Sequence, residues 1–176
     1  MRFAIIGNSG SGKSTLARRL AEAIDSPVLD MDTIAWESGK IAEQRDPFLA
    51  RADVIAFCSR HPRWIVEGCY AGLIAAALEY KPYLLLLDPG LDQCISNCRS
   101  RPWEPHKYES MEEQNRKLPF LLAWVEDYYR RSGDMSLAGH LALFEGYAGQ
   151  KLHLKGNHEA ERVLVTAANQ GNGSPA

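Results

Sequence analysis

The residues best suited to chemistry lie near the start of the chain, in the stretch GNSGSGKS that begins at Gly7. This stretch fits the pattern G-x-x-x-x-G-K-S/T, the phosphate-binding loop. Its glycines let successive backbone N–H groups turn toward a phosphate, and a helix that begins near Lys13 adds its positive N-terminal end. Lys13 is expected to reach the β- and γ-phosphates of a nucleoside triphosphate, and the Ser14 hydroxyl to bind Mg²⁺. The expected nucleotide-binding residues are Gly7, Asn8, Ser9, Gly10, Ser11, Gly12, Lys13, Ser14 and Thr15.

The surroundings of this loop support the same interpretation. The apolar residues 3–6 precede it as a buried strand, and residues 15–20 continue it as a helix. The alternative is a Gly/Ser-rich turn that only connects the strand to the helix, but strand–loop–helix is the context that distinguishes a true phosphate-binding loop. The sequence therefore predicts a nucleoside triphosphate site.

Carboxylates follow two further expected strands. Asp30 and Asp32 come after the short strand at residues 28–29, and Glu67 comes after residues 64–66. In open α/β sheets, ligands bind at the carboxyl ends of the strands. We expect Asp32, or Asp30 in its place, to orient Mg²⁺ through water or to accept a proton from a substrate hydroxyl, and Glu67 to hold the metal. For Asp30 and Asp32 the alternative is a helix cap and a solvated acid, and for Glu67 it is an ordinary salt bridge.

Two arginines stand where a helix that begins near Leu91 is expected to end. Arg99 and Arg101 precede a break at Pro102 and Pro105, after which helix is expected to resume. A loop with cations on both flanks suits a lid, at about residues 99–131, that closes over a transferred phosphoryl group. The alternatives are an exposed charged connector and, because an aromatic residue stands among the cations, a nucleic-acid patch.

The composition limits the classes of protein that come into question. The chain has 176 residues, which is one domain's length, and 20 Lys and Arg residues face 22 Asp and Glu residues. Nothing in this balance directs the chain to nucleic acid or to a membrane surface. No apolar stretch resembles a signal peptide or a bilayer span, so we expect a cytoplasmic protein. The four cysteines form no C-x-x-C pair and are expected to be free thiols.

Alternating strands and helices predict an α/β fold, a P-loop NTPase three-layer sandwich with a parallel sheet of about five strands and a helical lid. We expect one domain over residues 1–169 and a disordered tail at residues 170–176. A helix from Pro47 to about His61 is expected to turn Phe48, Ala52, Ile55 and Ala56 inward.

Three stretches also carry a resemblance to a known family: IIGNSGSGKSTLA at residues 5–17, VLDMDTIAW at 28–36 and WIVEGCY at 64–70. They resemble the bacterial proteins labelled DNA topology modulation protein, which belong to the adenylate kinase-like P-loop kinases. The resemblance covers most of residues 1–131. It implies a nucleotide-kinase fold with a lid, ATP·Mg²⁺ as the phosphoryl donor, and a turn at residues 155–158 beside the adenine.

The chain departs from that family's pattern where an acceptor would bind. Related kinases carry Asp-Gly at the third stretch, whereas this chain has Glu67 and Gly68. Nucleoside monophosphate kinases also place an arginine soon after this glycine to hold the acceptor's phosphate, and residues 69–72 contain none. This difference favours an acceptor without a phosphate, or one held by an arginine elsewhere. The arginines considered for that role are Arg45, Arg51 and Arg63.

The residues and the resemblance together favour an ATP-dependent kinase for a small molecule or nucleotide, acting on a hydroxyl or phosphate acceptor. Its catalytic residues would be Lys13, Asp32, Arg99 and Arg101, and its Mg²⁺ would lie at Ser14 and Glu67. A nucleotide-binding regulatory protein with little turnover and a nucleic-acid-associated ATPase are the alternatives. Nothing in the sequence determines an oligomeric state.

Overall fold

Five parallel strands form the centre of the molecule. The computed structural model describes residues 1–37, 43–105 and 108–171. The strands are β1 (Arg2–Gly7), β2 (Val28–Asp30), β3 (Trp64–Gly68), β4 (Tyr83–Leu87) and β5 (Lys151–Leu154). They lie in the order β2-β3-β1-β4-β5, and every neighbouring pair is parallel. This arrangement confirms the predicted α/β fold and places β1, which leads into the phosphate-binding loop, in the middle of the sheet.

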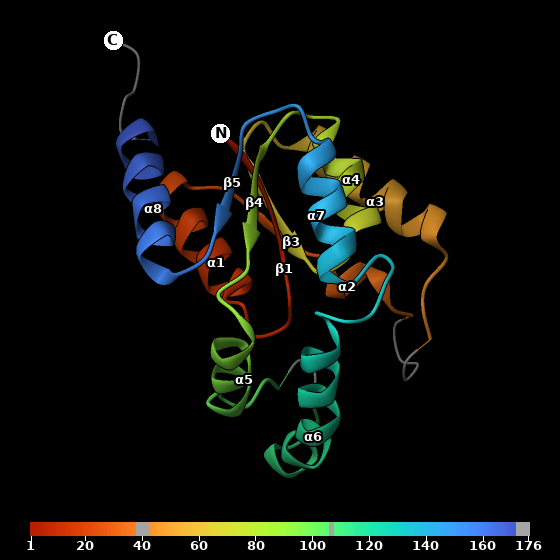
Figure 1. Cartoon of the computed structure of the whole chain (residues 1–176). Helices are drawn as coiled ribbons and strands as arrows, with labels where there is room; N and C mark the ends of the chain where they lie inside the picture. Colours follow the sequence, from red (N-terminus) through yellow and green to blue (C-terminus); the bar gives the residue numbers. More distant parts are fainter. Residues whose placement is uncertain (38–42, 106–107, 172–176) are drawn as a thin grey trace.

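Helices cover both faces of the sheet (Figure 1). On one side lie α1 (Lys13–Ile24) and α8 (Asn157–Gly171), and on the other lie α3 (Pro47–Arg60), α4 (Ala71–Leu78) and α7 (Leu137–Gly146). The short helix α2 (Asp32–Ala35) follows β2 directly. The molecule therefore has three layers, as parallel sheets require, because crossover helices cover both of their faces.

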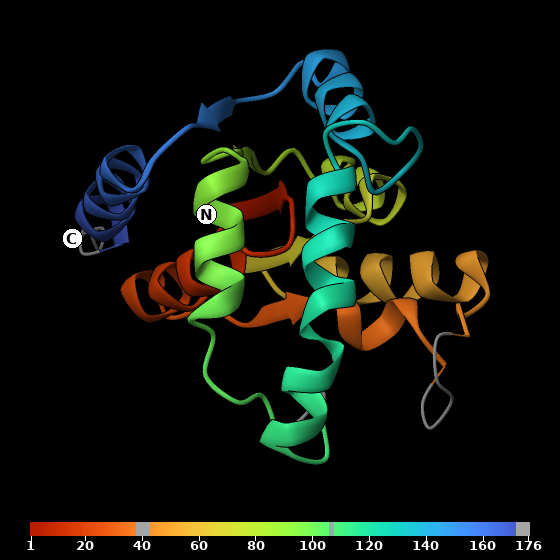
Figure 2. The same cartoon turned by 60° about the horizontal axis from the view of Figure 1, so that its bottom comes forward.

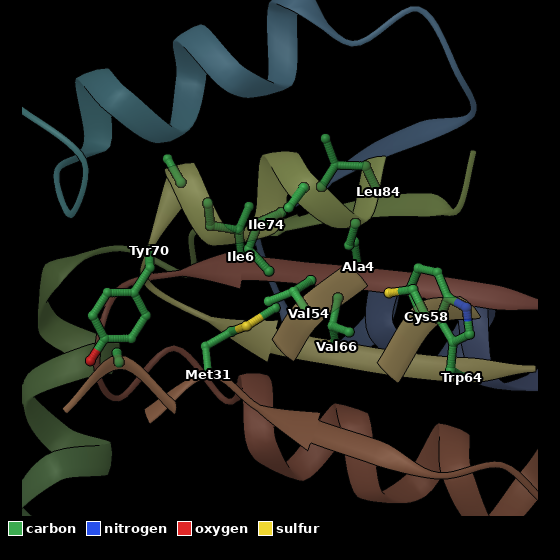
Figure 3. Close-up of a cluster of buried hydrophobic side chains, with 14 of the residues drawn as sticks. Ala4, Ile6, Met31, Val54, Cys58, Trp64, Val66, Tyr70, Ile74 and Leu84 are labelled. Atoms are coloured by element: carbon green, nitrogen blue, oxygen red, sulfur yellow. The ribbon is translucent and has the colours of Figure 1, made fainter. Parts of the chain in front are cut away.

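Alternate residues of β1 enter two different cores. Ala4 and Ile6 pack with α3, α4 and α7, in the cluster that Figure 3 shows around Ile74 and Trp64. Phe3 and Ile5 point the other way, against α1 and α8. Residues 3–6 of the strand are all apolar because both of its faces are buried.

A pair of helices, α5 (Leu91–Arg99) and α6 (Met111–Asp127), projects beyond the carboxyl end of the sheet, and the two lie side by side (Figure 2). They share a small core of their own, built on Cys94, Cys98 and Val125. The segment expected to be a lid thus contains two packed helices joined by the residues after Arg99. Residues 106–107 of that connection lie outside the described part of the chain.

The predicted inward face of α3 is correct only in part, since Ile55 packs against the core but Phe48 and Ala52 are exposed. Phe48 is 82% exposed, and the buried residues are Ala50, Val54 and Cys58. Asp46 caps this helix by accepting a hydrogen bond of 2.8 Å from the backbone N–H of Phe48. Apolar side chains surround α3 on several sides, so their spacing alone does not select one face.

Two further stretches differ from the expectation or extend it. Helix α7 had no counterpart among the predicted elements, and α8 continues to Gly171, while residues 172–176 lie outside the described residues. None of the described helices is both long enough and apolar enough to cross a bilayer.

Candidate active site

The phosphate-binding loop joins β1 to α1 in a tight, partly left-handed turn. Gly10 has φ +77° and Gly12 has φ +95°, a conformation that favours glycine. Lys13 begins α1 and is only 9% exposed, and its Nζ donates a hydrogen bond of 3.0 Å to the carbonyl oxygen of Asn8. The ammonium group is therefore folded back over the loop, where a bound phosphate would lie.

Both projecting helices hold this loop in place. From α5, the Nδ2 of Asn97 donates a hydrogen bond of 2.8 Å to the carbonyl oxygen of Gly10. On the α6 side, the Nδ2 of Asn8 donates one of 3.0 Å to the carbonyl oxygen of Val125. A Cβ at Gly10 would lie 2.3 Å from the carbonyl oxygen of Cys94, so the loop packs directly on α5. The shape of the loop thus depends on the helix pair.

The loop also has the polar groups and the space that a phosphate needs. Among the residues that the structure describes, the Ser11 hydroxyl is buried without a hydrogen-bond partner. Beside Gly12 there is open space, since a Cβ built there meets nothing within 4 Å. The N-terminal end of α1 faces the same place, with its unpaired backbone N–H groups and its positive dipole end. These features fit the triphosphate of a nucleotide.

The nine residues expected to contact the nucleotide fall into two groups. Seven of them, from Ser9 to Thr15, line a cavity of about 680 Å³ at the carboxyl end of the sheet. Gly7 and Asn8 lie behind the loop instead. A Cβ at Gly7 would lie 2.3 Å from the carbonyl oxygen of Leu87, and Asn8 is buried against α6. Gly7 and Asn8 therefore support the loop rather than line the cavity.

The same cavity extends to both sides of the central strand. Toward β5 it is lined by Leu154, Gly156 and Ala160, and toward β2 it is lined by Asp32, Glu67 and Cys69. The first group includes part of the turn expected beside the adenine. A nucleotide and a second molecule can therefore meet over the phosphate-binding loop.

Glu67 is the buried carboxylate of this cavity. It is 3% exposed and stands on β3, in register with Ile5 of β1 and Asp30 of β2. Burial raises the pKa of Glu67, and the charge of Lys13 and a hydrogen bond from the Ser14 hydroxyl partly offset this effect. A carboxylate and a serine hydroxyl in contact at the phosphate end are oxygen ligands of the type that Mg²⁺ prefers.

Asp32 and Asp30 have different positions. Asp32 lines the cavity, and its Oδ1 accepts a hydrogen bond of 2.8 Å from the hydroxyl of Tyr70. Asp30 accepts one of 2.9 Å from the backbone N–H of Asp32 and so stabilises the start of α2. The structure thus places Asp32, and not Asp30, on the cavity wall.

The two arginines of the expected lid differ in their relation to this cavity, although both line a small hollow beside Glu104. Arg101 lines the cavity and forms an ion pair of 3.0 Å with Glu104, which lines it as well. Arg99 is not among the residues that line this cavity, and it borders a shallow surface hollow with Asp92 and Ile95. Of these two arginines, only Arg101 lines the cavity that contains the phosphate-binding loop.

Sequence reasoning missed two hydrogen-bonded chains. Tyr70, which donates to Asp32, also accepts a hydrogen bond of 2.7 Å from Nε1 of Trp36. Deeper in the molecule, His140 of α7 is bonded at 2.8 Å both to the Tyr128 hydroxyl and to the carbonyl oxygen of Cys69. These residues are far apart in the sequence, so their spacing does not predict that they are in contact. The only sequence feature that could have indicated the first chain is the presence of aromatic residues near Asp32 and Glu67.

The order of the parallel strands and the phosphate-binding loop at the end of the central strand define a P-loop kinase-like fold. No protein-family model matches this sequence, and no match was found among curated proteins. Several of the solved structures that it resembles are kinases by name.

One of them is a gluconokinase from Sinorhizobium meliloti 1021, 17% identical with a TM-score of 0.54, where the match covers 96% of this chain and 91% of that one. Another is a sugar kinase from Janibacter sp. HTCC2649, 16% identical with a TM-score of 0.52, over 97% of this chain and 96% of that one. A shikimate kinase from Bacteroides thetaiotaomicron is 16% identical with a TM-score of 0.52, over 97% of both chains. At this level of identity the likeness establishes the fold.

Proposed function

We propose that this protein is an ATP-dependent small-molecule or nucleotide kinase that transfers the γ-phosphate of ATP·Mg²⁺ to a hydroxyl or phosphate acceptor. The observation that carries the proposal is the single cavity that joins the phosphate-binding loop to Asp32 and Glu67. A site for binding a nucleotide alone does not require this extension toward β2. The kinases among the structural neighbours support the same class of reaction.

The loop residues would bind and orient the phosphates. Lys13 would exchange its hydrogen bond to the carbonyl oxygen of Asn8 for bonds to the β- and γ-phosphates. There its positive charge would stabilise the negative charge that develops on the phosphate oxygens during transfer. Ser14 and Glu67 would hold Mg²⁺, which when bound supplies electrostatic stabilisation of the phosphate oxygens.

The β2 side of the cavity would receive the acceptor. Asp32 would accept the proton of the acceptor's hydroxyl or orient that hydroxyl for attack. The hydrogen bond from Tyr70 would hold the Asp32 carboxylate in the orientation needed for this role. Arg101 would contact the transferred phosphoryl group when the connection between α5 and α6 closes over it. We also propose that the chain belongs to the DNA topology modulation protein family. In the same proposal, ATP is the phosphoryl donor and the protein acts in the cytoplasm.

The test is the release of ADP from ATP·Mg²⁺ with and without acceptors, drawn from nucleosides, nucleotides and hydroxylated metabolites. A kinase releases ADP quickly only with its acceptor, and the phosphorylated acceptor is then found by mass spectrometry. Tight ATP binding with no acceleration by any acceptor would instead indicate a regulatory protein. Acceleration by DNA or RNA would indicate a nucleic-acid-associated ATPase.

A further inference from the structure

Gln114, near the start of α6, holds the backbone that follows Arg101. Its Oε1 accepts a hydrogen bond of 2.9 Å from the backbone N–H of Glu104, and its Nε2 donates one of 3.1 Å to the carbonyl oxygen of Pro102. One side chain thus binds two backbone groups of residues 101–104, which we call the arginine segment. Arg101, Pro102 and Glu104 of this segment line the cavity.

The two hydrogen bonds require an amide. The backbone N–H of Glu104 can only donate and the carbonyl oxygen of Pro102 can only accept, and the glutamine amide supplies the matching oxygen and NH₂ group. An ionised glutamate in this position would accept but could not donate, and a methionine would offer no donor and only a weak acceptor. We call Gln114 and its two hydrogen bonds the amide clamp.

The start of α6 gives the amide clamp a fixed base. Ser110 caps this helix by accepting a hydrogen bond of 3.1 Å from the backbone N–H of Glu113, and the Glu113 carboxylate accepts one of 2.9 Å from the backbone N–H of Glu109. The backbone N–H of Gln114 donates one of 3.1 Å to the carbonyl oxygen of Ser110. Because α6 also packs against α5 through the small core of the helix pair, the clamp is attached to that pair.

Arg101 is anchored on its other side by the end of α5. Ser100 directly precedes it, and the backbone N–H and the hydroxyl of Ser100 each donate a hydrogen bond of 3.0 Å to the carbonyl oxygen of Ser96. The Arg101 guanidinium itself is paired at 3.0 Å with Glu104, whose backbone the clamp holds. The residues on both sides of Arg101 are therefore bound to a helix, one to α5 and the other to α6.

We propose that Gln114 is a positioning residue for Arg101: it holds the arginine segment on α6, so that Arg101 meets the transferred phosphoryl group in a fixed orientation. The inference rests on the proposed function, in which Arg101 contacts that group. A closing movement then carries the arginine segment and the start of α6 together, and the backbone of this segment does not have to become ordered during the reaction. Orientation that is set in advance raises the rate of transfer and leaves ATP binding unchanged.

The first test removes the amide clamp. Gln114→Met loses both hydrogen bonds, so kcat with the acceptor that accelerates ADP release should fall about tenfold or more, while the KM for ATP changes by less than about twofold. Gln114→Ala removes the same bonds with a smaller side chain and should give the same result, so misfolding of one variant does not decide the outcome. An unchanged kcat, or a loss that falls equally on kcat and on ATP affinity, overturns the inference.

Gln150→Met is the matched control. Gln150 is exposed and does not line the cavity, so the same substitution there should leave kcat and KM at the wild-type values. A loss in this variant equal to that in Gln114→Met would overturn the inference, because the effect would then not depend on the amide clamp.

A double-mutant cycle separates positioning of Arg101 from general support of the lid. Because Gln114 acts through Arg101, Gln114→Met should change the kcat of the Arg101→Ala variant by less than about twofold. The same loss in both backgrounds would overturn the inference, since Gln114 would then act independently of Arg101. A normal kcat in Arg101→Ala would overturn it as well.

Hydrogen exchange of the Glu104 amide, followed by NMR on the nucleotide-free chain, tests the amide clamp without turnover. Exchange should be severalfold faster in Gln114→Met than in the wild type, while the amides of β1 exchange as before. Equal exchange of the Glu104 amide in the two proteins overturns the inference. A wild type whose ADP release no acceptor accelerates overturns the proposed function and this inference with it, whereas acceptor-dependent transfer that survives Gln114→Met overturns the positioning role alone.

Discussion

The hydroxyl of Tyr70 lies between Asp32 and Nε1 of Trp36, at 2.8 Å and 2.7 Å, and bonds to both. Tyr70 is 7% exposed and comes directly before α4, whereas Asp32 begins α2. Burial and the charge of Asp32 raise the pKa of Tyr70, so this hydroxyl keeps its proton and remains a donor to the carboxylate. The direction of the Asp32 carboxylate, which we propose faces the acceptor, is thereby set by a residue of the core.

Tyr70→Phe should therefore lower kcat without a matching change in the KM for ATP. It removes a hydrogen bond to a charged group and leaves Nε1 of Trp36 without its acceptor, a loss of about 1.5–3 kcal/mol that corresponds to roughly 10- to 100-fold in rate. Steady-state kinetics with the true acceptor measures this. Tyr80→Phe removes a comparable hydroxyl, bonded at 3.3 Å to the carbonyl oxygen of Ile55, and serves as the control. Equal losses in both variants would show that Tyr70 only supports the fold.

Lys13→Met should abolish phosphoryl transfer and preserve the fold. A methionine has a similar length but no charge, and phosphoryl transfer depends on electrostatic stabilisation of the phosphate oxygens. The folded protein loses one hydrogen bond to the carbonyl oxygen of Asn8, so we expect only a small change in the urea midpoint. Turnover at the wild-type rate in a stably folded Lys13→Met variant would exclude the phosphate-binding role of this loop.

The sequence was sufficient for the fold and for the loop because both depend on short-range patterns. Strand β1, the glycines and Lys13 are contiguous, and a parallel sheet follows from alternating apolar strands and helices. The choice between Asp30 and Asp32 required the structure, because it depends on how α2 begins. Residues far apart in sequence, such as those in the chain through Tyr70, meet only through packing.

Two errors of the sequence prediction, part of the inward face of α3 and the failure to predict α7, have a different cause. Spacing of apolar residues identifies a helix face only when one side is polar, and α3 carries exposed Phe48 and Leu49 beside its buried residues. Helix α7 contains His140, which is fully buried by pairing with Tyr128 and Cys69 rather than by being apolar. Such a polar residue in a core cannot be recognised from hydropathy.

Gly10→Ala should destabilise the protein and weaken ATP binding together. The new Cβ would meet the carbonyl oxygen of Cys94 at 2.3 Å, and φ +77° already disfavours a side chain. Gly90→Ala is a matched control, with φ +90° but nothing within 4 Å of its Cβ. We expect about 1–2 kcal/mol for the control from backbone strain and a larger loss for Gly10→Ala, measured by urea unfolding. Equal losses would show that the contact between the loop and α5 is unimportant.

His140 should make the protein less stable in mild acid. Burial lowers its pKa from 6.5 to about 4. Between these values the unfolded chain binds a proton that the folded chain does not, so lowering the pH through this window favours unfolding. The expected loss is about 1.4 kcal/mol per pH unit within the window, and the stability is fully present only above pH 6.5.

Urea unfolding from pH 7.5 to pH 5 measures this effect. His140→Gln should unfold more easily at pH 7.5, because two buried hydrogen bonds change, but its stability should fall less steeply toward pH 5. Glu67 has the opposite effect: because its pKa is raised in the folded protein, its contribution to stability is lost as the pH rises above 4.5. The wild type and His140→Gln share this contribution, so it does not affect the comparison. Parallel curves for wild type and His140→Gln would contradict the assignment.

The connection between α5 and α6 gives the last prediction, in which two arginines two residues apart should behave differently. Arg101 lines the cavity beside Glu104, whereas Arg99 does not line this cavity and meets Arg101 only at a small neighbouring hollow. A guanidinium that contacts the γ-phosphate only when the lid closes stabilises the transition state more than it stabilises bound ATP.

Arg101→Ala should therefore lower kcat by about 10³-fold while ATP affinity changes little, and Arg99→Ala should leave both nearly unchanged. Single-turnover transfer and ATP titration separate the two effects. Equal loss of kcat and ATP affinity in Arg101→Ala would reduce this arginine to a binding role. Normal turnover in Arg101→Ala would mean that another residue supplies the catalytic cation, and the candidates are Arg116, Lys117 and Lys107. Lys117 is paired with Glu113 at 2.6 Å, and Lys107 lies outside the described residues. A large effect of Arg99→Ala alone would mean that closure moves the end of α5, because Arg99 is the last residue of this helix and does not line the cavity in the structure.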